Sequence, residues 1–203
     1  MGIPIADAVV GELAAVAARL RADETRGGAS AGGLRWTAPE SWHITLQFLG
    51  NTSQEQCECL TARLREVRTA TFEVQLGEMG YFDRAGVLFA EVPVTPKLAG
   101  LQQRIVTATS QCGFVGEARA FHPHITLARG TGNKGRSRRG DKKPDPAARG
   151  QSVERDRRLG ELMARVGTRP AFTRFTAREF VLYESHLGPA GSRYEARARF
   201  KLQ

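Results

Sequence analysis

Two short stretches organise this chain: WHITLQFLG at Trp42–Gly50 and FHPHITLARG at Phe121–Gly130. Each contains the tetrad His-Ile-Thr-Leu, first at residues 43–46 and again at residues 124–127. Because side chains on a β-strand alternate between its two faces, the His and Thr of each tetrad project from one face, and the Ile and Leu project from the other. A repeated core stripe would need only the apolar positions to recur. The polar positions recur as well, so the tetrads predict a functional site built from two strands.

The overall composition is that of a globular protein. The chain has 203 residues, 41% of them hydrophobic and 25% charged, which is enough to bury a core in one domain or two small lobes. No apolar run approaches the length of a membrane span, and the N-terminus lacks a signal pattern. The three cysteines, Cys57, Cys59 and Cys112, are odd in number and lack metal-type spacing, which favours a reducing, cytoplasmic setting.

The formal net charge of +9 favours a polyanionic partner, with RNA as the first candidate, although a solvated basic surface explains the composition equally well. Residues 131–160 carry ten Lys or Arg and four acidic residues. Their glycines and prolines predict a flexible basic insertion at about 131–150, followed by a short helix from Ser152. A solvated insertion is the favoured interpretation, and a basic arm that raises the encounter rate with anionic substrate is the alternative.

Periodicity and capping signals predict the other elements. One helix runs from Asp7, the candidate N-cap, to just before Gly27. A capping box, Ser53 with Gln56, opens the next helix, and Thr95 caps a third helix. The predicted strands span residues 72–76, 175–183 and 194–202, with a hairpin at 81–92. We expect residues 1–5 to be too short for a stable strand and residues 186–192 to form a turn.

The order of these elements approximates an internal duplication, with one tetrad in each half. Hairpin connections predict an α+β fold of two lobes, in which antiparallel sheets face a central cleft and helices pack outside. Residues 1–203 would form a single bilobal domain. Facing lobes would bring the two His–Thr pairs together.

Paired histidines suit the opening of a phosphodiester by water. An imidazole titrates near neutrality, so one His can accept a proton from the attacking water while the other protonates the leaving oxygen. Hydroxyls of Thr45 and Thr126 would donate hydrogen bonds to the phosphoryl oxygens. No Ser or Cys elbow suggests acyl chemistry instead.

The chain resembles the two-histidine phosphoesterase superfamily, which is defined by paired H-x-T-x motifs. It is most similar to the RNA 2′,3′-cyclic phosphodiesterases, also called 2′-5′ RNA ligase-like proteins. The run W-x-x-P-E-x-x-H-x-T-L-x-F-L-G from Trp36 and the run F-H-P-H-I-T-L-A-R from Phe121 carry this resemblance. Apart from the basic insertion, it extends from about Gly2 to the C-terminus.

The resemblance implies hydrolysis of an RNA 2′,3′-cyclic phosphate to a 2′-phosphate, with some members joining or cleaving 2′-5′ linkages in vitro. His43 would be the proton donor and His124 the proton acceptor, while Thr45 and Thr126 would hold the phosphate. No metal or cofactor is implied. The expected partner is RNA or a nucleotide with a 2′,3′-cyclic phosphate end, and we expect a monomer that does not bind membranes.

Two features depart from the family pattern. Relatives usually open with a complete apolar strand, of which GIPI at residues 2–5 resembles only the tail. The loop after the second tetrad also differs in length and charge. Two alternatives remain: a metal-dependent hydrolase using His122, His124 and His186, and a nucleotide- or RNA-binding module without turnover.

Several residues near the tetrads have less defined roles. Arg129 is a candidate phosphate ligand, but strict alternation places it on the face opposite His124 unless the strand ends or twists first. Phe48 falls on the core side of its strand, where packing is the favoured role. Packing is also favoured for Tyr183 and Tyr194. His122, beside Pro123, is expected to line the cleft or to cap the strand end.

Overall fold

The computed structural model describes residues 1–26, 34–82, 85–130, 170–188 and 191–203. The helices in these ranges are α1 (Asp7–Arg26), α2 (Gln54–Leu64) and α3 (Pro96–Ser110), with a 3-10 turn at Pro39–Ser41. The strands are β1 (Gly2–Pro4), β2 (Leu34–Trp36), β3 (His43–Thr45), β4 (Phe72–Val74), β5 (Met79–Phe82), β6 (Val87–Glu91), β7 (His124–Gly130), β8 (Phe175–Ala177), β9 (Glu179–Gly188) and β10 (Gly191–Lys201). The predicted insertion at 131–150 and the helix predicted from Ser152 lie outside the described residues.

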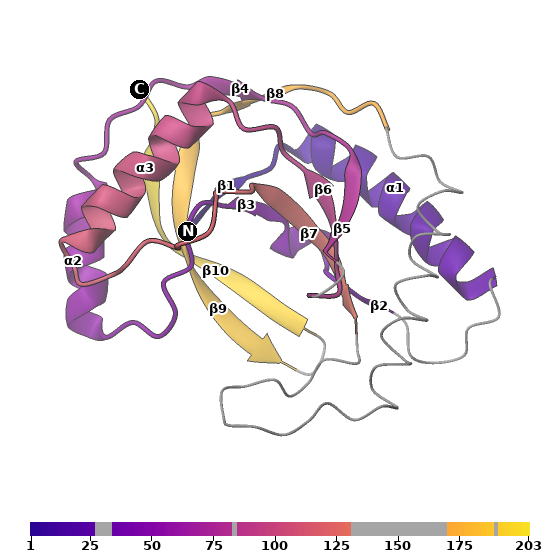
Figure 1. Ribbon diagram of the computed structural model, residues 1–203, viewed down its shortest axis with the longest axis horizontal. Coiled ribbons are helices and arrows are strands. Elements are labelled where there is room, and N and C mark those ends of the chain that lie inside the picture. Colours follow the sequence, from indigo (N-terminus) through magenta and orange to yellow (C-terminus); the bar gives the residue numbers. More distant parts are fainter. Residues whose placement is uncertain (27–33, 83–84, 131–169, 189–190) are drawn as a thin grey trace.

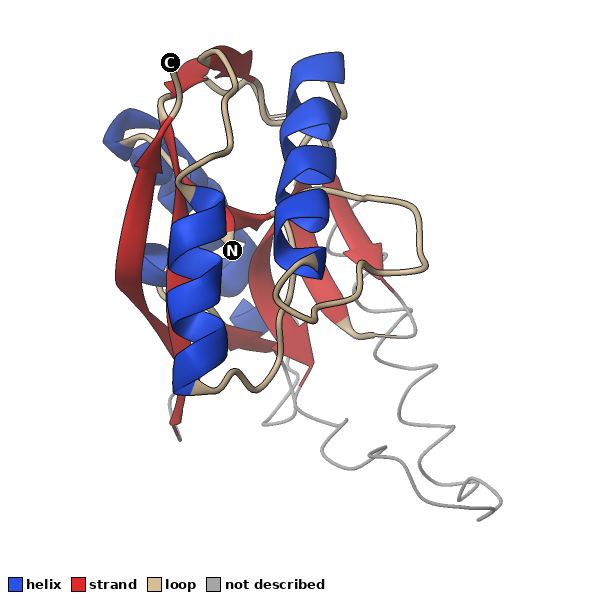
Figure 2. Ribbon diagram, turned by 90° about the vertical axis from the view of Figure 1, so that its left-hand side faces the viewer, coloured by secondary structure: helices blue, strands red, loops and turns tan. Residues whose placement is uncertain are grey.

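Two four-stranded antiparallel sheets form the centre of the fold. Their strand orders are β10-β9-β1-β3 and β2-β7-β6-β5, and β4 pairs with β8 in a separate ribbon. Helices α2 and α3 lie on one side of the strands, and α1 lies on the opposite side (Figures 1 and 2). The predicted α+β class, with antiparallel sheets and outer helices, is therefore confirmed. The two lobes and their origin by duplication stay a prediction.

Local capping chemistry sets where the helices begin. The Ser53 hydroxyl accepts from the Gln56 N–H at 3.1 Å, and the Gln56 side chain accepts from the Ser53 N–H at 3.0 Å, which completes the predicted capping box. The Thr95 hydroxyl accepts from the Leu98 N–H at 3.2 Å, as predicted. Asp7 is not an N-cap, because α1 already begins at this residue and its carboxylate lies in the first turn. Within the described ranges, no helix is long and apolar enough to cross a membrane.

The N-terminal segment contradicts the prediction that residues 1–5 form no stable strand. β1 lies inside its sheet, with β9 on one side and β3 on the other, and Ile3 is completely buried. A short strand is stable here because neighbours on both sides satisfy its backbone groups, which its own sequence does not reveal.

The C-terminal strands also differ from prediction. The strand predicted at 175–183 is interrupted at Arg178, and its halves, β8 and β9, join different sheets. β9 then continues to Gly188, so residues 186–188 belong to a strand rather than to a turn. Strict alternation would place Ala196 on the same face as Phe200, which is buried, but Ala196 is exposed, because a register shift between Ala196 and Ala198 interrupts the alternation of β10.

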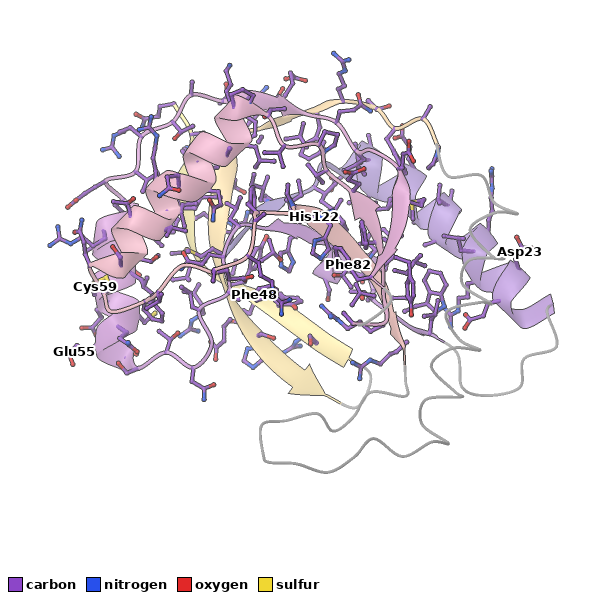
Figure 3. All side chains as sticks on the ribbon, viewed as in Figure 1. Asp23, Phe48, Glu55, Cys59, Phe82 and His122 are labelled. Carbon is purple, nitrogen blue, oxygen red and sulfur yellow. A yellow bond between two sulfur atoms is a disulfide. The ribbon has the colours of Figure 1, made fainter. Side chains whose placement is uncertain are left out.

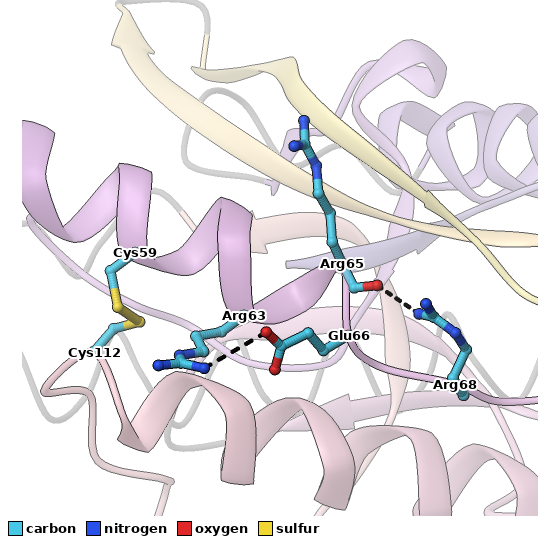
Figure 4. Close-up of polar contacts among 6 residues, drawn as sticks. All are labelled: Cys59, Arg63, Arg65, Glu66, Arg68 and Cys112. Carbon is cyan, nitrogen blue, oxygen red and sulfur yellow. Dashed lines mark hydrogen bonds and ion pairs between the residues drawn. A yellow bond between two sulfur atoms is a disulfide. The ribbon is translucent and has the colours of Figure 1, made fainter.

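Cys59 in α2 forms a disulfide with Cys112, which follows α3, with 5.8 Å between their Cα atoms (Figure 4). On the same side of these helices, Arg63 and Glu66 form an ion pair at 3.5 Å. Cys57 is the free cysteine. The disulfide contradicts the prediction of reduced cysteines. The spacing of the cysteines in the sequence could not reveal this bond, because it forms only where α2 and α3 pack together. The cysteine-based argument for a cytoplasmic setting is therefore lost.

Candidate active site

The two tetrads meet at one cavity, as the polar faces of β3 and β7 predicted. The cavity measures about 80 Å³, and its wall includes His43 and Thr45 from β3 together with Thr126 from β7. The alternate residues Ile44 and Ile125 are completely buried on the other face of each strand. His124 shares the face of Thr126 but is not part of the cavity wall. His124 nevertheless lies close enough for its charge to lower the pKa of His43.

His43 is held by one hydrogen bond and two aromatic rings. Its Nδ1 lies 3.0 Å from the Ser41 carbonyl oxygen, so Nδ1–H donates and Nε2 is the nitrogen left for proton exchange. The rings of Tyr183 and Tyr194 lie 5.0 and 4.6 Å from the imidazole, centroid to centroid. The two tyrosines therefore do pack, as predicted, but they pack against His43, and Tyr194 also lines the cavity.

His124 is held in a closely similar way. Its Nδ1 lies 2.8 Å from the carbonyl oxygen of His122, again two residues upstream. The rings of Phe82 and Phe89 lie 5.2 and 5.3 Å from its imidazole, and the ring of His122 lies at 6.2 Å. His122 and Phe82 lie together in the central region of Figure 3. Each histidine thus has a fixed tautomer and ring orientation.

Both imidazoles lose basicity in this site. Burial lowers the pKa of His43 from 6.5 to about 4, with smaller decreases from the positive charges of the N-terminal ammonium and His124, while the bond to Ser41 opposes the shift. Burial also lowers the pKa of His124, as do the charges of His122 and Arg129. Both rings are therefore neutral near pH 7, so a proton donor must gain its proton when an anion binds.

Arg129 lines the cavity, although strict alternation predicted the opposite face. The register between β6 and β7 shifts, since Leu88 pairs with Ala128 whereas Phe89 pairs with Thr126. The extra residue is Leu127, which leaves both Leu127 and Ala128 completely buried. This β-bulge returns Arg129 to the face of Thr126 and so meets the condition for its expected role as a phosphate ligand, a break in the strict alternation of the strand.

Phe48 also differs from its predicted place in the core. Its side chain is 57% exposed and lines the cavity. β3 ends at Thr45, so its alternation does not extend to the residues that follow. Leu46 and Gln47 are both buried, whereas Phe48, labelled near the centre of Figure 3, is exposed. Gln47 is anchored by the Thr109 hydroxyl, which donates to its Oε1 at 2.9 Å. The sequence offered no signal for this change of direction.

The histidines proposed as alternative metal ligands do not come together. His186 lies on the β9–β10 hairpin, where its Nε2 is 3.4 Å from Glu195 and 3.9 Å from Glu184. In the part of the chain that the structure describes, no group of three or more His, Cys, Asp or Glu side chains is arranged to hold a metal ion.

Fold and site together define an α+β protein with paired His-x-Thr motifs on two antiparallel sheets. A family model described as "2'-5' RNA ligase superfamily" matches residues 10–140, and the chain belongs to this family. It is 35% identical to an RNA 2',3'-cyclic phosphodiesterase of Bacillus subtilis over 100 residues, covering 47% of this chain and 55% of that protein. It is 31% identical to the Escherichia coli protein of the same name over 96 residues, covering 47% and 54%. The chain thus matches about half the length of these relatives.

Solved structures share this fold. The crystal structure of E. coli LigT in its apo form superposes with a TM-score of 0.68, covering 99% of this chain and 94% of LigT at 22% identity. LigT complexed with 3'-AMP gives a TM-score of 0.65 at 21% identity, covering 99% and 95%. Both likenesses confirm the fold.

Proposed function

We propose that the protein is a metal-independent RNA 2′,3′-cyclic phosphodiesterase, which hydrolyses the cyclic phosphate of an RNA end or a nucleotide to a 2′-phosphate. The observation that carries this proposal is the cavity that His43, Thr45, Thr126 and Arg129 share. The names of the relatives and the family membership support it. As in some members of the resembled family, the same site would support 2′-5′ ligation in vitro, with the 5′ hydroxyl of a second RNA attacking phosphorus in place of water while the 3′ oxygen leaves.

In the proposed reaction, Nε2 of His124 accepts a proton from a water molecule as the water oxygen bonds to phosphorus. The bond between phosphorus and the 3′ oxygen breaks, and Nε2 of His43 donates a proton to that oxygen. Both nitrogens are free for this exchange because each Nδ1 is already bonded to a backbone carbonyl. Hydroxyls of Thr45 and Thr126 and the guanidinium of Arg129 stabilise the charge on the non-bridging oxygens.

The size of the cavity limits what enters it. A volume of about 80 Å³ is well below the range of roughly 300–1,000 Å³ typical of whole-ligand pockets. The phosphate therefore enters the cavity, and the nucleoside lies at its rim, where the exposed ring of Phe48 offers an apolar surface. This arrangement predicts recognition of a phosphate end rather than of one particular base.

The proposal is tested by incubating the protein with nucleoside 2′,3′-cyclic phosphates in excess chelator and identifying the product by chromatography. We expect the 2′-phosphate alone. His43→Ala and His124→Ala should each lower kcat by about 10² to 10⁴ while binding survives. His186→Ala is the matched control, because this exposed ring lies outside the cavity wall, and it should leave kcat unchanged.

Other outcomes identify the alternatives. Unchanged substrate at high protein concentration would indicate a binding module without turnover. Activity that is lost in chelator and restored by zinc would indicate the metal-dependent hydrolase.

A monomer and a cytoplasmic location are also part of the proposal. Gel filtration tests the first, and a disulfide between Cys59 and Cys112 that persists in the cell would contradict the second.

A further inference from the structure

We propose that Arg35 binds a second phosphate group, the one attached to the 5′ oxygen of the nucleoside whose cyclic phosphate reacts. This inference rests on the proposed function and extends it to the class of substrate: an RNA end, or a nucleotide phosphorylated on its 5′ side, in preference to an unphosphorylated nucleoside cyclic phosphate.

Arg35 and Arg129 face the same cavity from neighbouring strands. Arg35 lies in β2 and is paired directly with Arg129 of β7 in the antiparallel register. Both side chains line the cavity. Two like charges directly opposite each other on an antiparallel pair repel, so this pairing costs stability unless an anion lies between or beside them.

Among the described residues, no carboxylate forms an ion pair with Arg35. None of the residues that line the cavity is acidic. Glu24 bonds to both sequence neighbours of Arg35, but it uses one oxygen for the Leu34 N–H, at 2.8 Å, and the other for the Trp36 indole N–H, at 3.0 Å. Because no described carboxylate pairs with it, the Arg35 guanidinium is available to bind an anionic ligand in the cavity.

The reacting phosphate does not need this second arginine. A cyclic phosphodiester carries one negative charge on two non-bridging oxygens. Thr45, Thr126 and the forked guanidinium of Arg129 already supply donors for these oxygens. β2 is the edge strand of its sheet, so Arg35 starts about 4.8 Å farther out than Arg129, away from β6. An anionic group at that place lies beyond the reacting phosphate, across the ribose, where RNA carries its next phosphate.

The test compares adenosine 2′,3′-cyclic phosphate with the same compound carrying a 5′-phosphate. We expect the wild-type protein to hydrolyse the 5′-phosphorylated substrate with a kcat/KM about tenfold higher, as one charge-assisted hydrogen-bonded contact allows. Arg35→Gln should lower kcat/KM far more for the 5′-phosphorylated substrate, which brings the ratio close to one. Arg129→Gln should instead lower both values by a similar factor, because it contacts the reacting phosphate.

Arg19→Gln is the charge-matched control, since Arg19 is exposed on α1 and does not line the cavity. It should leave the ratio at its wild-type value. A wild-type ratio near one would overturn the inference. An Arg35→Gln variant that lowers kcat/KM equally for both substrates would also overturn it, because both arginines would then bind one phosphate. A ratio altered as strongly by Arg19→Gln would reduce the effect to overall charge, and would overturn it too.

A binding measurement separates this inference from the proposed function. Calorimetry with adenosine 2′-monophosphate and adenosine 2′,5′-bisphosphate should show tighter binding of the bisphosphate, and Arg35→Gln should abolish the difference. If neither cyclic phosphate is hydrolysed, the proposed function fails. In that case, the ratio of the two affinities alone tests the second phosphate site.

Discussion

Binding of a phosphate anion should raise the pKa of His43 by about three units. The free protein holds this pKa at about 4, mainly through burial, so its imidazole is neutral near pH 7 and has no proton to donate. The proposed role of proton donor requires the protonated form in the complex with substrate. The negative charge of the substrate phosphate is the one charge that the proposed reaction brings to the ring.

The size of the shift follows from Coulomb's law. A single negative charge about 4 Å from the ring, at an effective dielectric constant of about 20, stabilises the imidazolium by about 4 kcal/mol. Since 1.36 kcal/mol corresponds to one pKa unit, this interaction is worth about three units. From a starting value of about 4, the pKa of His43 reaches about 7 in the complex, which suits an acid working near neutral pH.

The assay is a pH titration of ¹⁵N-histidine-labelled protein by NMR, without ligand and with saturating adenosine 2′-monophosphate. The Nε2 resonance of His43 should titrate near pH 4 in the first series and near pH 7 in the second. His186 is the internal reference, because it is exposed on the β9–β10 hairpin outside the cavity wall, so the ligand should leave its ring resonances unchanged. His43→Gln assigns the resonance.

Two results would refute the reasoning. A pKa of His43 that stays near 4 in the saturated complex would exclude it as the proton donor and leave His124 as the acid. A pKa near 6.5 in the free protein would mean that burial among Ser41, Tyr183 and Tyr194 does not disfavour the charged ring.

Three more predictions follow from single features. Cys59→Ser should lower the free energy of unfolding by about 4 kcal/mol in urea titrations, because the disulfide closes a loop across 53 residues, whereas Cys57→Ser should have little effect. The free energy of unfolding should fall as pH drops from 6.5 towards 4, by on the order of 3 kcal/mol, since the unfolded chain binds a proton at His43 first; His43→Gln should flatten this slope. Gly2→Ala should lower kcat by about 10- to 100-fold, because its Cβ would lie 2.7 Å from Cδ2 of His43; Gly11→Ala, with open space around it, is the control, and equal kcat values would contradict the reasoning.

Features that depend on near neighbours in the chain were predictable. The alternation of His and Thr with Ile and Leu placed the polar face of β3 on the cavity and the apolar face in the core. The capping box at Ser53 and the cap at Thr95 were correct because their hydrogen bonds span only three residues. The resemblance to the family rested on the same local signals.

Features that depend on distant partners were not predictable. Arg129 reaches the cavity because a bulge against β6 adds Leu127 to one strand, and nothing in the local sequence marks that bulge. Phe48 reaches the rim because β3 stops at Thr45. Cys59 meets Cys112 because two helices pack side by side.

The sequence by itself determined which side chains the proposed chemistry uses, since two polar His–Thr faces on apolar strands predict a pair of acid–base groups with hydroxyl donors. Only the tertiary structure decided their protonation state and which other residues lie beside them. Burial, which no local pattern contains, lowers the pKa of His43, and strand pairing across the sheet places Arg35 opposite Arg129. Both depend on contacts between segments far apart in the chain, so they exist only once the sheets have formed.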